Sequence, residues 1–177
     1  MTIRKVRLED AAQVAECVRE TYDEYGFTWD PDDYHADLYD LSEYVREAEF
    51  WVAEEDGVIL GCGGITWHER LPGDVGEAGG VDGTIRILGT SAELVRFYVR
   101  PSGRRRGIAT SILEMSIEAA RVRGVRAIEI WSDKRFQDAH RLYQRYGARI
   151  VGDRICDDPD ESPEWGLVLE VQEKSDP

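Results

Sequence analysis

Residues 93–109 read ELVRFYVRPSGRRRGIA and join a predicted strand to the strongest predicted helix of the chain. The strand, Glu93–Val99, is mostly apolar and aromatic, and a Pro-Ser-Gly turn follows it. The helix covers Arg106–Arg123, where apolar residues recur at helical spacing until Gly124. N–H groups at a helix start lack an intrahelical acceptor and lie at the positive end of the helix dipole, so this turn is suited to bind a pyrophosphate. An ordinary structural turn is the alternative.

Two familiar phosphate-binding loops do not occur in the sequence. No GxxxxGK[ST] pattern is present, which excludes a P-loop NTPase in practice. No GxGxxG pattern is followed by an acidic residue about 20 positions later, so a dinucleotide site of the Rossmann type is not expected.

Positive charge gathers around the turn in an otherwise acidic chain. The 177 residues carry a net charge of −14, which disfavours binding to nucleic acid. Residues 96–154 nevertheless hold 14 Lys and Arg against 6 Asp and Glu, a net charge of +8. The densest part is Arg100, Arg104, Arg105 and Arg106, and arginine suits forked contacts to phosphate. A solvated face that balances the acidic ends would show the same pattern.

The composition indicates a folded cytoplasmic protein. Hydrophobic residues make up 42% of the chain, but no apolar stretch approaches the roughly 20 residues that cross a bilayer. The first ten residues, MTIRKVRLED, lack the apolar core of a signal peptide. Cys17, Cys62 and Cys156 are too widely spaced for a disulfide framework or a zinc site. We therefore expect reduced thiols, no metal and no membrane partner.

Two segments resemble the GNAT acyltransferases. The run from Arg104 to Ala109, RRRGIA, resembles the R/Q-x-x-G-x-G/A signature with which those proteins bind the pyrophosphate of acetyl-CoA. Upstream, Leu94–Val99 and Pro101 resemble the family's central strand and its V-x-P ending. Downstream, residues 139–148, AHRLYQRYGA, resemble the segment A-x-x-L-Y-x-x-x-G-F. The resemblance is clear over about residues 92–152, whereas the first 70 residues match in element order alone.

This resemblance implies an α+β fold. A mixed, mostly antiparallel central sheet is flanked by helices and is splayed at the cofactor site. One acyltransferase domain would cover residues 1–172, and residues 173–177 would form a frayed tail. The residue pattern agrees in element order, with helices expected at 11–25 and 34–48 and a long loop or irregular hairpin at 70–89. His35 and His140 are expected at the surface or in caps.

The resemblance also implies acetyl-CoA as cosubstrate. Backbone groups of Phe97 and Val99 would pair with the pantetheine amides, and the arginine side chains of the turn could reach the 3′-phosphate. The backbone that would hold the pyrophosphate comprises Arg104, Arg105, Arg106, Gly107, Ile108, Ala109 and Thr110.

A direct transfer needs a base and an acid. The acceptor amine has a pKa near 10.4 and must lose a proton before it attacks a thioester, and the departing thiolate needs a proton or stabilisation. By resemblance Tyr143 is the acid and Glu93 the base; His68 competes as base, and Tyr143 could simply pack. Phe136 stands where the family often has an asparagine that contacts the cofactor, so that contact is either remade by Asp133 or Asp138 or lost.

The acceptor is expected to be a small cationic amine. Tyr25, Trp29 and Tyr34 alternate with carboxylates in the segment that normally forms the acceptor pocket, with His68 nearby, and such a mixture attracts cations. An acidic surface is the equal alternative. The loop at 70–89 is a candidate lid or homodimer contact. Three other functions stay open: an inactive CoA-binding regulatory module, an enzyme that acetylates a protein N-terminus or lysine, and an interaction protein whose basic stripe meets an acidic partner.

Overall fold

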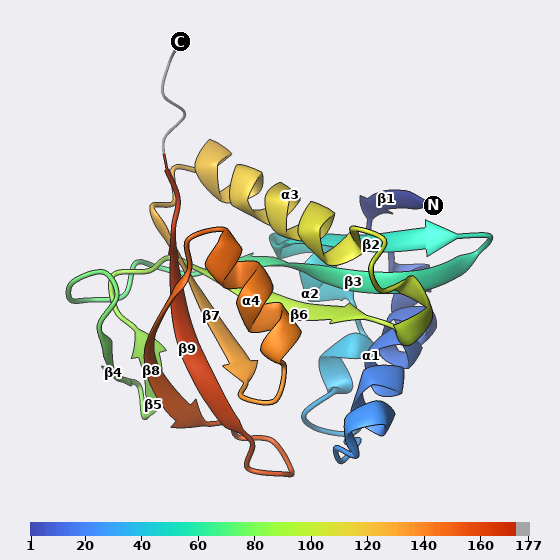
Figure 1. Cartoon of the computed structure of the whole chain (residues 1–177), viewed down its shortest axis with the longest axis horizontal. Helices are drawn as coiled ribbons and strands as arrows, with labels where there is room; N and C mark the ends of the chain where they lie inside the picture. Colours follow the sequence, from blue (N-terminus) through green and yellow to red (C-terminus); the bar gives the residue numbers. More distant parts are fainter. Residues whose placement is uncertain (173–177) are drawn as a thin grey trace. The chain divides into compact units, whose positions relative to one another are not determined.

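Seven strands form one sheet in the order β1-β2-β3-β6-β7-β9-β8 in the computed structural model, which describes residues 1–172 (Figure 1). The β6-β7 pair is parallel, whereas β1-β2, β2-β3, β7-β9 and β8-β9 are antiparallel. The predicted α+β fold with a mixed, mostly antiparallel sheet and flanking helices is confirmed. By its internal contacts the chain divides into two compact units, which are treated in turn.

The first unit comprises residues 1–66, 95–116 and 158–160. Its elements are β1 (Thr2–Lys5), α1 (Ala11–Tyr25), α2 (Ser42–Glu47), β2 (Glu49–Glu55), most of β3 (Val58–Trp67), the second part of β6 (Ala92–Val99) and the start of α3 (Ile108–Val122). Short 3-10 turns lie at Leu8–Asp10, Ala36–Leu38 and Pro101–Gly103.

The apolar face of α1 forms the core of this unit. Val14, Val18 and Tyr22 are buried one or two helical turns apart, and they pack on Phe50 of β2 and Ile59 of β3. Burial of each such side chain contributes about 1.5–3 kcal/mol. The helix ends at residue 26, a glycine whose φ of +70° permits a left-handed cap.

The single helix expected over residues 34–48 is wrong. The segment forms a 3-10 turn and then the six-residue α2. The Asp40 side chain accepts the Ser42 N–H at 3.0 Å, and such local bonds compete with a continuing helix. His35 and His140, expected at the surface or in caps, are both buried. His35 stands at the N-cap position of the 3-10 turn Ala36–Leu38, but its side chain makes no capping hydrogen bond.

The second unit comprises residues 67–94, 117–157 and the described residues from 161 onward. Its elements are the first part of β6, the end of α3, β4 (Ala78–Val81), β5 (Thr84–Ile87), β7 (Ala127–Asp133), α4 (Gln137–Arg145), β8 (Arg149–Ile155) and β9 (Pro163–Glu170). β4 and β5 form a separate hairpin in the segment expected to be a long loop or irregular hairpin. Positive φ angles at Asp82 and Gly83 suit the tight turn between them.

β6 is the strand that positions the candidate site. Within residues 1–172 its parallel pairing with β7 covers Ala92 and Glu93, which fits the splaying predicted for this strand. Arg96 then adopts a φ of +52°, an uncommon angle for a residue with a side chain. The prediction of one domain over residues 1–172 stays a prediction, and the tail predicted at 173–177 lies outside the described residues.

Candidate active site

The turn after β6 leads to an open helix start. The first intrahelical bond of α3 runs from the Ser111 N–H to the Gly107 carbonyl at 2.9 Å, so the N–H groups of residues 108–110 precede the hydrogen-bonded helix. Gly107 has a φ of +79°, and a Cβ built on it would meet no described atom within 4 Å. An anion can therefore approach this exposed backbone closely.

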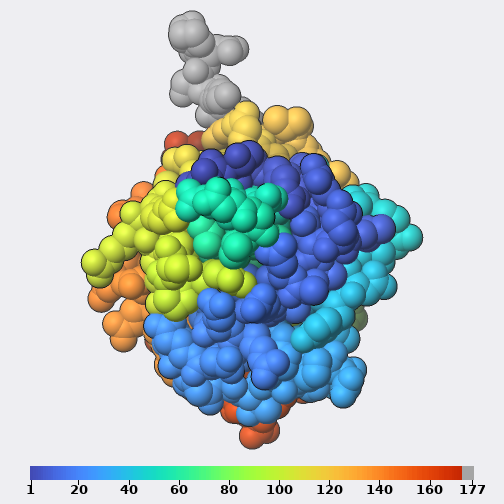
Figure 2. Space-filling view, turned by 90° about the vertical axis from the view of Figure 1, so that its right-hand side faces the viewer, coloured from blue at the N-terminus to red at the C-terminus, as the bar shows by residue number. Residues whose placement is uncertain are grey.

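Two of the three turn arginines are paired with carboxylates. The Arg104 guanidinium makes a forked ion pair with Glu24 of α1, with Nη1 donating at 2.8 Å. Arg106 donates to Glu55, at the end of β2, at 2.6 Å. Figure 2 shows this yellow-green segment beside the green turn between β2 and β3 and the blue helical segment. An incoming phosphate would compete with these carboxylates for the arginines.

Arg100 differs from the other basic residues because it is buried. Its guanidinium lies 3.6 Å from Glu16 and 3.5 Å from Glu20, both on α1. Its backbone N–H donates to the Leu60 carbonyl at 2.9 Å, which ties the start of the turn to β3. The basic block is therefore not one solvated face.

Glycines on β3 make room for the strand that the sequence assigned to the cofactor. A Cβ on Gly63 would lie 2.8 Å from the ring of Phe97, and one on Gly61 would lie 2.7 Å from Ile108 and 3.2 Å from Val99. Side chains at these glycines would force β6 and the helix start away from β3. The run GCGG at 61–64 is a sequence pattern that could have indicated this close approach, because glycine inside a strand often marks a place where another chain segment comes near.

The aromatic segment expected to bind the acceptor is partly packed inward. Trp29 stacks on His35 with ring centroids 4.0 Å apart, and Tyr34 has the Arg96 guanidinium over its ring at 5.1 Å. Tyr25, by contrast, is 40% exposed. Trp29 and Tyr34 thus contact protein groups of the first unit, and the Tyr25 ring, though partly exposed, lies 5.4 Å from that of Phe27.

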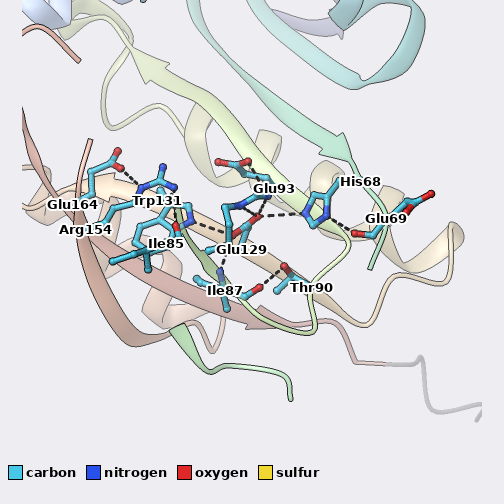
Figure 3. Close-up of polar contacts among 11 residues, drawn as sticks. His68, Glu69, Ile85, Ile87, Thr90, Glu93, Glu129, Trp131, Arg154 and Glu164 are labelled. Carbon is cyan, nitrogen blue, oxygen red and sulfur yellow. Dashed lines mark hydrogen bonds and ion pairs between the residues drawn. The ribbon is translucent and has the colours of Figure 1, made fainter. Parts of the chain in front are cut away.

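Carboxylates and one guanidinium meet at the start of β6 in the second unit (Figure 3). Glu93 of β6 and Glu129 of β7 are register partners. Glu129 is fully buried, and Arg86 of β5 donates to it through Nε at 2.8 Å and through Nη2. The same Nη2 lies 3.7 Å from Glu93.

The Glu93 carboxyl is poised to exchange a proton near neutral pH. Its burial raises its pKa, and the negative charge of Glu129 raises it further, to about 7. The positive charges of Arg86, Arg154 and His68 act against this rise. A general base is most effective when its pKa lies near the working pH.

His68 is brought to the same cluster but is less suited to accept a proton. Its Nε2 lies 3.4 Å from Glu129, and its Nδ1 lies 2.8 Å from the Glu69 carbonyl. The interaction with Glu129 raises the pKa of His68, which favours the charged imidazolium. Its backbone N–H donates to the Ser91 carbonyl at 3.1 Å and so fixes the end of β3 beside β6.

Tyr143 lies on α4 and is 4% exposed. The helix is tied to β7 by His140 Nε2, 3.0 Å from the Ser132 hydroxyl. Of the two residues suggested to replace an asparagine contact, Asp133 is held by Arg135 at 2.6–2.9 Å, and Asp138 pairs with Arg141 at 2.7 Å. Both carboxylates therefore already accept hydrogen bonds from an arginine.

Comparison with known proteins identifies the family. A family model described as "Acetyltransferase (GNAT) family" matches residues 14–148. The chain belongs to the GNAT acetyltransferase family. The match begins on α1, so it also covers much of the N-terminal segment in which the sequence resembled GNAT proteins in element order alone.

GNAT relatives appear among both sequences and solved structures. The uncharacterized N-acetyltransferase YjgM of Escherichia coli is 27% identical over 150 residues, which cover 82% of this chain and 80% of that protein. A GNAT acetyltransferase from Staphylococcus aureus has a TM-score of 0.72 at 17% identity over 97% of this chain and 99% of that one. The putative acetyltransferase yncA from Salmonella typhimurium, solved with acetyl-CoA, has a TM-score of 0.66 at 19% identity over 100% and 97% of the two chains.

Glu129 and Arg86 are residues of this GNAT protein that the sequence analysis missed. Glu129 is the charged residue in the apolar strand AIEIW at 127–131, a pattern that could have marked a buried, paired carboxylate. Arg86 lay in a segment expected to be a loop or irregular hairpin, and its partner 43 positions away cannot be read from spacing. Among residues 1–172, no cluster of His, Cys, Asp and Glu is arranged to hold a metal ion, and no helix has the length and apolar character to span a bilayer.

Proposed function

We propose that this GNAT enzyme transfers an acetyl group from acetyl-CoA to the primary amine of a small cationic molecule by direct attack. Family membership makes the chain an acetyltransferase with acetyl-CoA as its cosubstrate. The observation that carries the finer proposal is the Glu93 carboxyl, which is partly buried beside Glu129 and has a pKa of about 7.

The first unit supplies a backbone that fits the coenzyme. The N–H groups of residues 108–110 and the open space over Gly107 would receive the pyrophosphate. Backbone groups of Phe97 and Val99 would pair with the pantetheine, and Arg105, which is exposed, would meet the 3′-phosphate. Arg104 and Arg106 would either release the carboxylates of Glu24 and Glu55 to bind phosphate, or bind carboxylate and phosphate together.

Proton transfer is assigned to the second unit. Acetyl-CoA supplies the acetyl group as a thioester. Glu93 takes a proton from the acceptor ammonium, directly or through water, so that the amine nitrogen carries a free electron pair. The nitrogen attacks the thioester carbonyl carbon, so a C–N bond forms and the C–S bond to the coenzyme breaks. Tyr143 gives its hydroxyl proton to the departing sulfur and regains one from the acylated nitrogen, which leaves the neutral amide. The pKa of His68 is raised by Glu129, which favours the charged imidazolium, so His68 is not assigned as the base.

The acceptor class is inferred from charge. The exposed residues of the segment 23–40 include the carboxylates Asp23, Asp32, Asp33 and Asp40 and the tyrosines Tyr25 and Tyr39. A surface of this kind attracts cations through its field and through cation–π contact. The matched family accounts for the transfer of acetyl groups, and this surface supports a positively charged amine as recipient.

An acceptor screen with the purified protein tests the proposal. Polyamines, aminoglycosides, amino acids, peptide N-termini and lysine peptides are each offered with acetyl-CoA, and free CoA is measured with a thiol reagent. The three cysteines of the chain are buried, which keeps the background low. We expect turnover with small polycations and its loss in Glu93→Gln. Turnover with peptides alone would reassign the acceptor to protein, and coenzyme binding without turnover would indicate a regulatory module.

A further inference from the structure

Glu129 is a buried carboxylate that the proposed reaction does not use. It accepts hydrogen bonds from the Ile87 N–H at 3.0 Å and from Trp131 Nε1 at 3.0 Å, in addition to those from Arg86 (Figure 3). Burial alone would raise the pKa of Glu129, but these donors and His68 outweigh burial and lower the pKa to about 2. The residue is therefore a permanent negative charge inside the second unit.

One guanidinium stands between two carboxylates. Arg86 binds Glu129 with two nitrogens, whereas its nearest approach to Glu93 is 3.7 Å, longer than a hydrogen bond. Because Glu93 and Glu129 are register partners on adjacent strands, either could take this arginine. The additional donors from Ile87 and Trp131 orient the Glu129 carboxylate and so favour its pairing with Arg86.

We propose that Glu129 is a positioning residue for the transfer reaction, because it holds Arg86 away from a full ion pair with Glu93 and thereby leaves Glu93 able to accept the proton of the acceptor amine. This inference rests on the proposed function, in which Glu93 is the base. The charged groups that face Glu93 include Glu129 of β7, Arg86 of β5, Arg154 of β8 and His68 after β3.

The buried pair of Arg86 and Glu129 affects both the β4–β5 hairpin and the Glu93 carboxyl. The pair anchors the β4–β5 hairpin, and both of its charges act on Glu93 through space. Replacement of either partner therefore changes the proton affinity of Glu93 in a direction set by which partner is lost. Without the negative charge of Glu129, Arg86 turns to Glu93 and stabilises its charged form. Without Arg86, one positive charge beside Glu93 is lost while the negative charge of Glu129 remains, so the neutral form of Glu93 is stabilised.

Two variants with opposite expected effects test this assignment. Carboxyl carbons are labelled with ¹³C, and Glu93 is identified by the signal that is lost in Glu93→Gln. In Glu129→Gln, which keeps an acceptor for Ile87 and Trp131, we expect the pKa of Glu93 to fall by at least about one unit. In Arg86→Gln we expect it to rise. Glu170→Gln, which removes a surface carboxylate paired with Arg149 in the same unit, is the control and should titrate as the wild type.

Activity provides the second readout. The acidic limb of the kcat/KM profile is expected to move to lower pH in Glu129→Gln and to higher pH in Arg86→Gln. A folded Glu129→Gln variant whose Glu93 titrates as in the wild type would overturn the inference, and if that variant does not fold, Arg86→Gln decides by the same criterion. Full activity in Glu93→Gln would instead remove the proposed base, while the NMR titration would still report on the charge arrangement.

Discussion

Arg96 and Asp37 form a bidentate ion pair between β6 and the segment that joins α1 to α2. Nε donates to Oδ2 at 2.9 Å and Nη2 donates to Oδ1 at 2.7 Å, while Nη2 also reaches the Tyr34 carbonyl at 2.7 Å. The pair anchors the candidate acceptor segment to the strand assigned to the coenzyme. It also accounts for the positive φ at Arg96, since several contacts hold this side chain in place.

Loss of this pair is expected to destabilise the protein. Arg96→Ala removes the guanidinium that donates to Asp37 and to the Tyr34 carbonyl, while Asp37 keeps the hydrogen bond from the Tyr44 hydroxyl. We expect a cost of about 1–3 kcal/mol, because the guanidinium is largely buried whereas Asp37 is one-third exposed. Urea unfolding at pH 7 measures the change. Arg141→Ala, which removes the exposed pair with Asp138, is the matched control and is expected to unfold as the wild type. Equal stability of the two variants would contradict the anchoring role.

Removal of a competing carboxylate is expected to strengthen coenzyme binding. Glu24→Gln frees Arg104 and removes a negative charge near the helix start, so the Kd for acetyl-CoA falls by about 2- to 10-fold at low salt. Calorimetry at two salt concentrations measures the effect, which screening reduces. Glu47→Gln changes the net charge equally at an exposed site and serves as control. Weaker binding in Glu24→Gln would show that this pair instead shapes the site.

Gly107 is expected to matter through the space above it. Gly107→Glu and Gly124→Glu both force a side chain onto a glycine with positive φ and open surroundings, one at each end of α3, and each costs about 1 kcal/mol of stability. The Gly107 variant alone places a carboxylate at the proposed pyrophosphate site, and its affinity for acetyl-CoA is expected to fall at least about tenfold. Equal affinities in the two variants would remove this turn from the coenzyme site.

The raised pKa of Glu93 makes both activity and stability depend on pH. Burial, then the charge of Glu129, moves the pKa from 4.5 to about 7, so kcat/KM is expected to fall below about pH 7. Between pH 4.5 and 7 the folded state binds more protons than the unfolded state, so this group's contribution to stability is lost as pH rises. The free energy of unfolding of Glu93→Gln is therefore expected to exceed that of the wild type by about 1–3 kcal/mol at pH 8 and to equal it below pH 4. An unchanged difference across this range in urea unfolding would contradict the raised pKa.

Tyr143 is expected to affect turnover more than binding. Phenylalanine keeps the shape of this buried side chain but cannot protonate the leaving sulfur, so kcat of Tyr143→Phe falls by about 100-fold with a smaller change in the KM for acetyl-CoA. Tyr146→Phe, at the end of the same helix, is the control and is expected to keep wild-type kcat. A wild-type kcat in Tyr143→Phe would leave this tyrosine a packing role.

Local patterns predicted most elements well. The bounds of α1 and β6 agree with the helix expected at 11–25 and the strand expected at Glu93–Val99, because each pattern lies next to a strong stop, Gly26 for the helix and Pro101 for the strand. The prediction of one helix at 34–48 was wrong because two kinds of contact determine the backbone path of this segment. These are side-chain hydrogen bonds within the segment and the ion pair of Asp37 with Arg96, 59 positions away. His35 was expected at the surface or in a cap, because no local pattern shows that Trp29 stacks on its ring.

By itself, the sequence determined the fold class, the family resemblance and the turn with its open helix start. These depend on residues close together in the chain, where spacing determines backbone geometry. Only the tertiary structure decided which charges meet. Arg86 with Glu129, Arg104 with Glu24 and Arg96 with Asp37 lie 43, 80 and 59 positions apart. Proton affinity at Glu93 depends on such distant neighbours because electrostatic energy follows distance in space and the loss of water around a group, and neither is encoded in local spacing.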